Sequence, residues 1–190
     1  MTEQRSQSWH QIVGQVTAEY SRLPQLEKDW IAARLKSLGE LQGRLNQLFE
    51  KGDGLSACGA CSGECCAKGH NHMTLANLLC FLQQDEPPPA SDFSRTCPFL
   101  TEQGCSLPVA RRPYNCISFV CDIIEKSLTS AELAEFYSLD QQLRGIYQEF
   151  AGRYTGAGMT GLLLQQHRLA GRAFLARKTT AGSVSGSTGA

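Results

Sequence analysis

Residues 51–72 read KGDGLSACGACSGECCAKGHNH and are poor in the apolar side chains that order a protein core. This stretch holds four cysteines and five glycines, with Leu55 as its one large aliphatic side chain and no aromatic residue. Hydrophobic burial cannot offset the roughly 1–2 kcal/mol per residue that ordering this backbone costs. Bound metal can, since structural zinc supplies roughly 10–16 kcal/mol in small finger peptides. We therefore expect the segment to depend on metal for its fold.

The spacing of the cysteines is typical of metal ligands. Cys58 and Cys61 form a C-x2-C pair, a common way for one turn to present two thiolates to one ion. Cys65 and Cys66 are neighbours whose side chains diverge, so we expect them to serve different sites, or one site and a second role. Eight candidate metal ligands result, the count for two sites of four cysteines, although other divisions are open: Cys58, Cys61, Cys65, Cys66, Cys97, Cys105, Cys116 and Cys121.

Other uses of the cysteines fit the sequence less well. The chain has nine cysteines, an odd number, so complete internal disulfide pairing is impossible. The C-x2-C pair lacks the preceding strand and the βαβ pattern of a thioredoxin-like redox site. Cys80 stands apart in the apolar segment 74–84, a short helix that Thr74 is expected to cap, and we predict that it is a core residue. His70 and His72 are either metal ligands or residues that support ligands.

Two groups of cations each allow two interpretations. Four thiolates on a zinc ion or a cubane leave about −2 per site. The cations within the cysteine zone could offset that charge or could be ordinary surface residues: Lys68, Arg95, Arg111 and Arg112. A second group near the C-terminus is expected to form a solvated face that complements a helix dipole, rather than a surface for nucleic acid or membrane: Arg168, Arg172, Arg177 and Lys178.

Composition limits the class of protein and its partners. The 190 residues are 42% hydrophobic and 19% charged, with a formal net charge of zero, so no global charge attracts nucleic acid or a membrane surface. The first 15 residues lack the roughly 7–15-residue apolar run of a secretory signal. No apolar stretch approaches the ~20 residues of a membrane span. We expect a cytoplasmic protein without a nucleic-acid or membrane partner.

Two helices are predicted before the cysteine zone. The first has an apolar stripe over residues 9–23, with Ser6 or Ser8 available as its N-cap. The second spans 24–50, and two glycines after residue 51 are expected to end it. The apolar stripes are Trp9, Ile12, Val13, Val16, Tyr20 and Leu23 in the first, and Leu26, Trp30, Ile31, Leu35, Leu38, Leu41, Leu45, Leu48 and Phe49 in the second.

Two further helices are predicted after the cysteine zone. The residues TSAE, 129–132, fit a capping box in which Thr129 is the N-cap and Glu132 occupies the third helical position. A last helix is expected over 161–177, before a tail without apolar periodicity. The stripe that follows the capping box is Leu133, Phe136, Tyr137, Leu143, Ile146, Tyr147, Phe150 and Tyr154.

The predicted fold class is mainly α, with helical flanks around an irregular, metal-stapled Cys-rich core and little or no β-sheet. We divide the chain into an N-terminal helical hairpin (1–54), a Cys-rich metal-binding core (55–125), C-terminal helices that pack on the core (126–178) and a disordered tail (179–190).

Four sequence elements over residues 58–122 together resemble one known family. CGACSGECC, CPFL, GCSL and RRPYNC occur in the order found in the CxxCxxCC (YkgJ-like) family of zinc- or iron-chelating cysteine-cluster proteins. Three residues, rather than two, precede the cysteine pair here, and Ile117 stands where the family has arginine. The resemblance implies metal binding, with cluster ligands at Cys58, Cys61, Cys65, Cys66, Cys97, Cys105 and Cys116. A related motif in flagellin lysine methylases is thought to hold a [4Fe–4S] cluster, which by analogy favours iron–sulfur.

We hypothesise a metal-binding protein that holds one or two iron–sulfur clusters, with 4Fe–4S favoured, or zinc ions on cysteine thiolates. Thiolate sulfur suits both metals, so sequence alone leaves the choice open. One alternative is a cluster-dependent redox enzyme. Another is a helical interaction or regulatory module that is stabilised by structural zinc and recruits a protein partner through its helical flanks.

Overall fold

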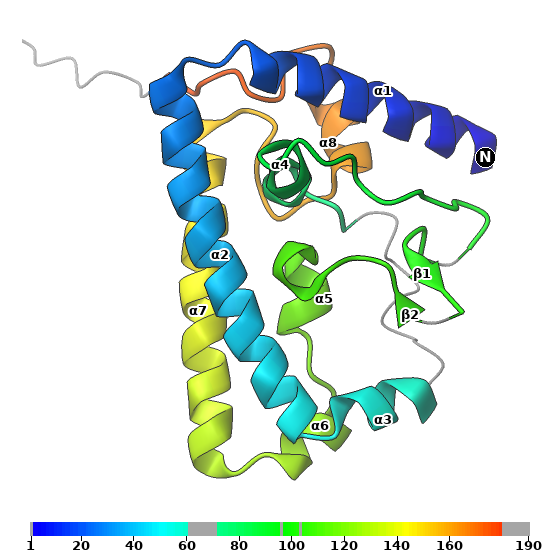
Figure 1. Cartoon of the computed structure of the whole chain (residues 1–190), viewed down its shortest axis with the longest axis vertical. Coiled ribbons are helices and arrows are strands. Elements are labelled where there is room, and N and C mark those ends of the chain that lie inside the picture. The colour runs from blue at the N-terminus through cyan, green and yellow to red at the C-terminus, as the bar shows by residue number, and fades with distance from the viewer. Residues whose placement is uncertain (1, 61–71, 96, 103, 180–190) are drawn as a thin grey trace, which may run out of the picture.

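The computed structural model describes residues 2–60, 72–95, 97–102 and 104–179. The fold is mainly α-helical, which confirms the predicted class, and within these residues the one sheet is a two-stranded antiparallel hairpin (Figure 1). The elements are α1 Thr2–Ser21, α2 Gln25–Lys51, α3 Gly54–Ala60, α4 Leu75–Leu82, β1 Leu100–Thr101, β2 Gly104–Cys105, the 3-10 helix η2 Val109–Arg111, α5 Tyr114–Ser118, α6 Asp122–Ser127, α7 Ser130–Arg153 and α8 Leu162–Leu169.

The helices α2 and α7 run side by side and form one long wall of the molecule (Figure 1). Their predicted stripes face inward, and the fully buried side chains are Ile31, Leu38 and Leu45 from α2 and Phe136, Leu143 and Phe150 from α7, among others. Three exposed ion pairs also link the helices, Arg34–Glu149 at 2.9 Å, Arg44–Glu135 at 2.7 Å and Lys51–Glu132 at 2.9 Å. Exposed pairs contribute at most about 1 kcal/mol each, so apolar packing holds the wall together.

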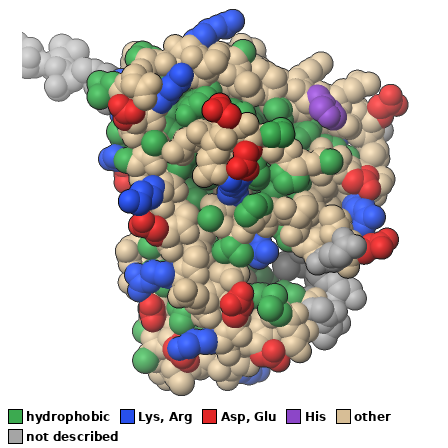
Figure 2. All heavy atoms as spheres, in the orientation of Figure 1, with side chains coloured by type: hydrophobic (Ala, Val, Ile, Leu, Met, Phe, Trp, Pro, Cys, Tyr) green, Lys and Arg blue, Asp and Glu red, His purple; other side chains and the backbone are tan. Residues whose placement is uncertain are grey.

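Charge on the surface is mixed in sign. Figure 2 shows Lys or Arg and Asp or Glu side chains alternating along the edge where α2 and α7 lie. None of the described helices is both long and apolar enough to cross a lipid bilayer.

The predicted apolar stripes are wrong at two positions, which are exposed. The buried face of each helix is narrower than the spacing of its apolar residues suggested. Leu26, in the first turn of α2, is 82% exposed, and Tyr137 of α7 is 49% exposed. Tyr137 is next to the fully buried Phe136 and is therefore rotated by about 100° around the helix axis. Leu139, which the stripe omitted, takes the buried position.

The helix α1 lies across one end of the wall and packs on α4 and α8 (Figure 1). Its predicted stripe is confirmed, with Trp9, Ile12 and Val16 buried. The prediction of an N-cap at Ser6 or Ser8 is wrong, because the helix begins at Thr2 and both serines lie inside it. The polar residues of this first turn stay helical while exposed to solvent.

The chain remains helical for longer than expected at the start of the cysteine zone. Gly52 ends α2 as predicted, but Asp53, in a left-handed conformation with φ of 55°, turns the chain directly into α3. A Cβ on Gly52 would lie 2.9 Å from Cγ2 of Ile124, so this corner packs closely on α6. The predicted irregular core therefore begins with a helical turn that carries Cys58.

All eight residues of α4 are buried. Thr74 is its N-cap, as predicted, and accepts a hydrogen bond from the backbone N–H of Asn77. Cys80 is 6% exposed, which confirms that it is a core residue. Burial raises the pKa of its thiol to about 12, although nearby Arg111 opposes that shift.

The capping box at the start of α7 is confirmed, with both reciprocal hydrogen bonds between Thr129 and Glu132.

The prediction of a helix over 161–177 is wrong, because α8 ends at Leu169. Ala170 and Gly171 follow in left-handed conformations, with φ of 48° and 87°, and turn the chain back. The predicted tail lies outside the described residues from position 180 onward.

After this turn the chain runs in extended form beside the end of α7. The N–H of Gly156 donates to the carbonyl of Phe174 at 2.8 Å, and Tyr154 pairs with Arg177 in an antiparallel bridge. Two consecutive N–H groups, of Phe174 and Leu175, donate to the Glu19 carboxylate of α1 at 3.2 and 2.7 Å. The segment 172–178 therefore joins the first helix to the end of α7.

The carboxylate of Glu27, in the first turn of α2, binds side chains from the end of α7 and from segment 172–178. It lies 7% exposed, forms an ion pair with Arg153 and lies 3.5 Å from the guanidinium of Arg177. The Arg153 guanidinium also stacks over the Trp30 ring at 4.3 Å. Hydrogen bonds from Arg153 lower the pKa of Glu27, although burial opposes the shift.

Candidate metal centre

Besides His72, which lies just before α4, the described candidate ligands come from five short segments on one side of the α2–α7 wall. Figure 1 shows α3, the β1–β2 hairpin, α5 and α6 all on this side. Cys58 lies on α3, Cys105 on β2, Cys116 on α5, and Cys121 is the N-cap residue of α6. Cys97 precedes β1. The other candidates lie outside the described residues: Cys61, Cys65, Cys66 and His70.

Two of the predicted donors come together across a long stretch of sequence. Nδ1 of His72 lies 3.4 Å from Sγ of Cys116, a residue 44 positions later. The histidine is half-buried and the cysteine is exposed, so the pair is open to solvent. Imidazole nitrogen and thiolate sulfur are the donors preferred by zinc and also bind iron, so the chemistry of this pair fits a metal ion.

Local structure positions each residue of the pair. Next to His72, the backbone carbonyl of buried Met73 accepts a hydrogen bond from the N–H of Leu162 at 2.7 Å. On the other, Tyr114 and Ile117 are buried and anchor α5, while Cys116 between them is exposed. The short helix therefore directs its cysteine outward.

A buried polar network joins the two backbone segments that carry the pair. The carbonyl of Arg112, four residues before Cys116, accepts hydrogen bonds from Nε2 of Gln42 at 2.5 Å and from Nδ2 of Asn77 at 2.9 Å. Nδ2 of Asn77 also donates to the Tyr147 hydroxyl at 3.0 Å. The Thr74 hydroxyl, two residues after His72, donates to Oδ1 of Asn77 at 2.7 Å. The spacing of His72 and Cys116 is thus set by groups within the core.

Sequence reasoning missed this network. Burial raises the pKa of Tyr147, although its hydrogen bond with Asn77 opposes the shift, so its hydroxyl remains a neutral hydrogen-bonding group. The signal in the sequence is Asn77, a polar residue inside the apolar run TLANLLCFL. A buried side-chain amide requires hydrogen-bond partners, and these identify the carbonyl and hydroxyl groups around it.

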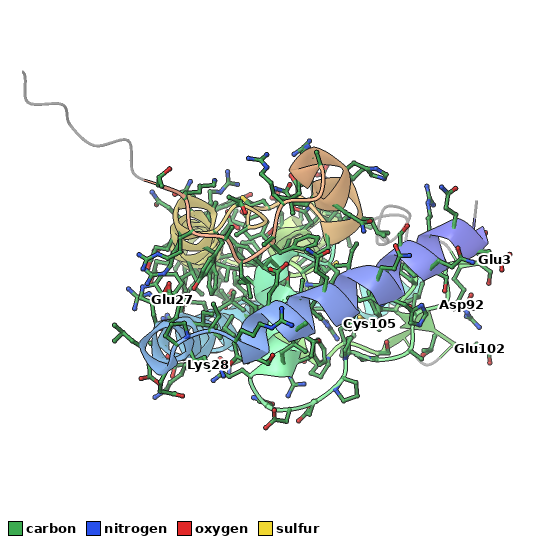
Figure 3. All side chains as sticks on the ribbon, turned by 90° about the horizontal axis from the view of Figure 1, so that it is seen from above. Glu3, Glu27, Lys28, Asp92, Glu102 and Cys105 are labelled. Atoms are coloured by element: carbon green, nitrogen blue, oxygen red, sulfur yellow. The ribbon has the colours of Figure 1, made fainter. Side chains whose placement is uncertain are left out.

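The hairpin places two other cysteines in different surroundings. Cys97 is 8% exposed and belongs to the hydrophobic core cluster, whereas Cys105 is exposed and pairs with Leu100 across the hairpin. The Phe99 ring packs edge-on against Trp9 of α1 at 5.9 Å and so attaches the hairpin to the first helix. In Figure 3, Cys105 lies in the same half of the molecule as Asp92, Glu102 and Glu3.

The described cations of the cysteine zone have partners of their own. Arg95 pairs with Asp92 at 3.1 Å, and the Arg112 guanidinium donates to the carbonyl of Leu107 at 3.2 Å. Arg111 pairs with Glu86 and stacks over the Phe81 ring at 4.6 Å. Two of the three therefore have a carboxylate beside them, and the fourth candidate, Lys68, lies outside the described residues.

The arrangement falls short of a complete ligand set in the part of the chain that the structure describes. No group of three His, Cys, Asp or Glu side chains there is close enough to hold a metal ion. The described residues bring two potential metal donors together, His72 and Cys116. Compared with known protein families, curated proteins and solved structures, the chain matches none of them.

Proposed function

We propose that the protein binds a metal through cysteine thiolates, either as an iron–sulfur cluster or as zinc. The observation that carries this proposal is the 3.4 Å approach of His72 Nδ1 to Cys116 Sγ, two donors from distant parts of the chain. The density of cysteines in residues 58–66 and the resemblance to the cysteine-cluster family support the same function. Cys61, Cys65 and Cys66 enter the proposal from the sequence alone.

The surroundings of the pair also suit a bound metal. Deprotonated thiolate and neutral imidazole bind metal without a large rearrangement when the backbone already holds them together. Here the Arg112 carbonyl and the Thr74 hydroxyl, both tied to Asn77, hold the two segments. A metal would add a coordination link between α5 and the segment before α4, and so stabilise the contact between them.

Anaerobic purification followed by an absorption spectrum and metal analysis tests the proposal. A brown protein with a broad visible band identifies iron–sulfur, and a colourless protein with stoichiometric zinc identifies zinc. A purified, folded chain that binds neither metal after loading would rule the proposal out.

Cysteine variants assign the ligands. We expect Cys116→Ser, Cys58→Ser and Cys97→Ser each to lower the bound metal, and the last two to lower solubility as well. The matched control is Cys80→Ala, which removes a buried core thiol and should keep the metal at the wild-type level. Full metal occupancy in Cys116→Ser would remove that residue from the site.

A further inference from the structure

We infer that His72 is itself a metal ligand, and that His72 and Cys116 bind one and the same ion. The inference rests on the proposed function and makes it more specific, because it assigns a zinc-type mononuclear ion to this pair. It concerns these two residues and assigns no others.

The distance between the two donors is close to that between two ligands of one ion. With a Zn–S distance of about 2.3 Å, a Zn–N distance of about 2.05 Å and tetrahedral angles, the sulfur and nitrogen ligands of one zinc ion lie about 3.6 Å apart. The observed separation between Nδ1 of His72 and Sγ of Cys116 is 3.4 Å. The pair therefore already has nearly the spacing of two ligands on one ion.

A four-iron cluster holds its protein ligands further apart than a single ion does. In a four-iron cluster each iron binds three bridging sulfides and one protein ligand, so two protein ligands always lie on different irons. Ligands on different irons are separated by the body of the cluster and cannot approach as closely as two ligands of one ion. The His72–Cys116 spacing thus disfavours a four-iron cluster bound by both residues.

Buried hydrogen bonds, rather than two flexible side chains alone, hold the donors at this spacing. Thr74 and Arg112 flank the pair in sequence, and both bond to the fully buried Asn77. The two backbones are consequently held at a fixed separation by the core. Such prior positioning lowers the entropic cost of binding an ion.

One other role would produce the same short distance. His72 could donate a hydrogen bond to the sulfur of a metal-bound Cys116 without touching the metal, as groups around metal ligands commonly do. The two roles differ in the atoms that surround the metal. X-ray absorption spectroscopy at the zinc edge identifies the atoms that are bound to the metal.

The experiment compares the zinc-loaded full chain with two variants at position 72. For the wild type we expect imidazole nitrogen and sulfur in the zinc shell. In His72→Ala we expect the imidazole signal to be lost and the zinc dissociation constant to rise by more than ~100-fold, since losing only a supporting hydrogen bond costs about 10–100-fold. His72→Cys restores a donor near the same place and should hold zinc in a shell with one imidazole nitrogen fewer and one sulfur more than the wild type.

The control is His167→Ala, an exposed histidine in the last turn of α8, which should leave the spectrum and the affinity unchanged. Circular dichroism checks that each variant is folded. If His72→Ala does not fold, His72→Cys decides: an unchanged zinc shell in that variant overturns the inference.

The possible failures are distinguishable. An all-sulfur shell in the wild type, or a four-iron cluster that is lost in Cys116→Ser, overturns the mononuclear His72 site but leaves the proposed function standing. A folded chain that binds neither zinc nor iron overturns both.

Discussion

The amide nitrogen Nδ2 of Asn77 donates to the hydroxyl of Tyr147 at 3.0 Å, and both side chains are buried in the core. The same nitrogen also donates to the carbonyl of Arg112. One amide group therefore ties α4 to α7 and to the chain that leads into α5. Because Cys116 lies on α5 and His72 lies just before α4, this contact connects core packing with the candidate metal centre.

We expect Asn77→Ala to destabilise the fold by about 1–3 kcal/mol, because it leaves buried polar groups of Arg112 and Tyr147 with fewer partners. The control is Tyr147→Phe, which keeps the ring and removes one hydroxyl, and should cost about 1 kcal/mol. Urea denaturation measures both free energies of unfolding. Asn77→Ala with wild-type stability would show that the network does not support the fold.

The buried carboxylate of Glu27 predicts a dependence of stability on pH. Its pKa is lowered in the folded protein, chiefly by hydrogen bonds from Arg153. Its contribution is therefore fully present above the unfolded pKa of about 4.3, and is lost as the pH falls through the lower folded value. We expect Glu27→Gln to cost about 1–3 kcal/mol at pH 7, and the difference from wild type to shrink below about pH 4.

Urea denaturation at a series of pH values checks this expectation. The control is Glu149→Gln, which breaks an exposed ion pair with Arg34 and should cost less than about 1 kcal/mol. A Glu27→Gln deficit that stays constant from pH 7 to pH 3 would contradict the assigned role of the carboxylate.

Gly156 has no room for a side chain. An added Cβ would lie 2.7 Å from the Cα of Phe174, in the extended segment that returns to α7. We expect Gly156→Ala to destabilise the protein by about 1–3 kcal/mol, since the backbone has to move apart. Gly145→Ala is the control, because Gly145 lies inside α7 with open space around it, and should stabilise by about 0.5–1 kcal/mol. Thermal denaturation of the two variants should shift the midpoint in opposite directions.

The thiols of Cys80 and Cys105 should differ sharply in reactivity. Cys80 is buried with its pKa raised to about 12, whereas Cys105 is exposed. Since the thiolate is the reactive form, we expect iodoacetamide to modify Cys105 in the native protein and Cys80 only after denaturation. Peptide mass spectrometry measures both sites. Zinc added before the reagent should slow modification of Cys105 if that residue is a ligand.

The helices were predictable where hydrophobic periodicity alone determines burial. The stripes from Trp9 to Val16 and from Phe136 to Phe150 follow that rule, and so does the capping box at Thr129. The end of α8 was not, because no proline follows Leu169 and the turn depends on Ala170 in a left-handed conformation. Residues other than glycine rarely adopt this conformation, so the sequence gives little sign of the turn.

The sequence names candidate ligands by residue type, but it does not show which of them lie together. Cysteine density identified the zone, and His72 could be named as a candidate. The proximity of His72 to Cys116 depends on where α4 and α5 lie against the α2–α7 wall, which no spacing within the zone encodes. The bonds that Asn77 makes to Thr74 and to the carbonyl of Arg112 hold the two segments in that arrangement.

Segment 172–178, which joins α1 to the end of α7, is made late during synthesis of the chain. The amide groups that bind Glu19 lie 155 and 156 residues downstream, and Arg153 lies 126 residues after Glu27. At a synthesis rate of about 5–20 residues per second, the ribosome takes roughly 8–30 s to deliver the partners of Glu19. Until α7 and α8 have been made, the apolar faces of α2 and α1 lack their main packing partners. We expect these faces to be the part of the growing polypeptide that general chaperones engage longest.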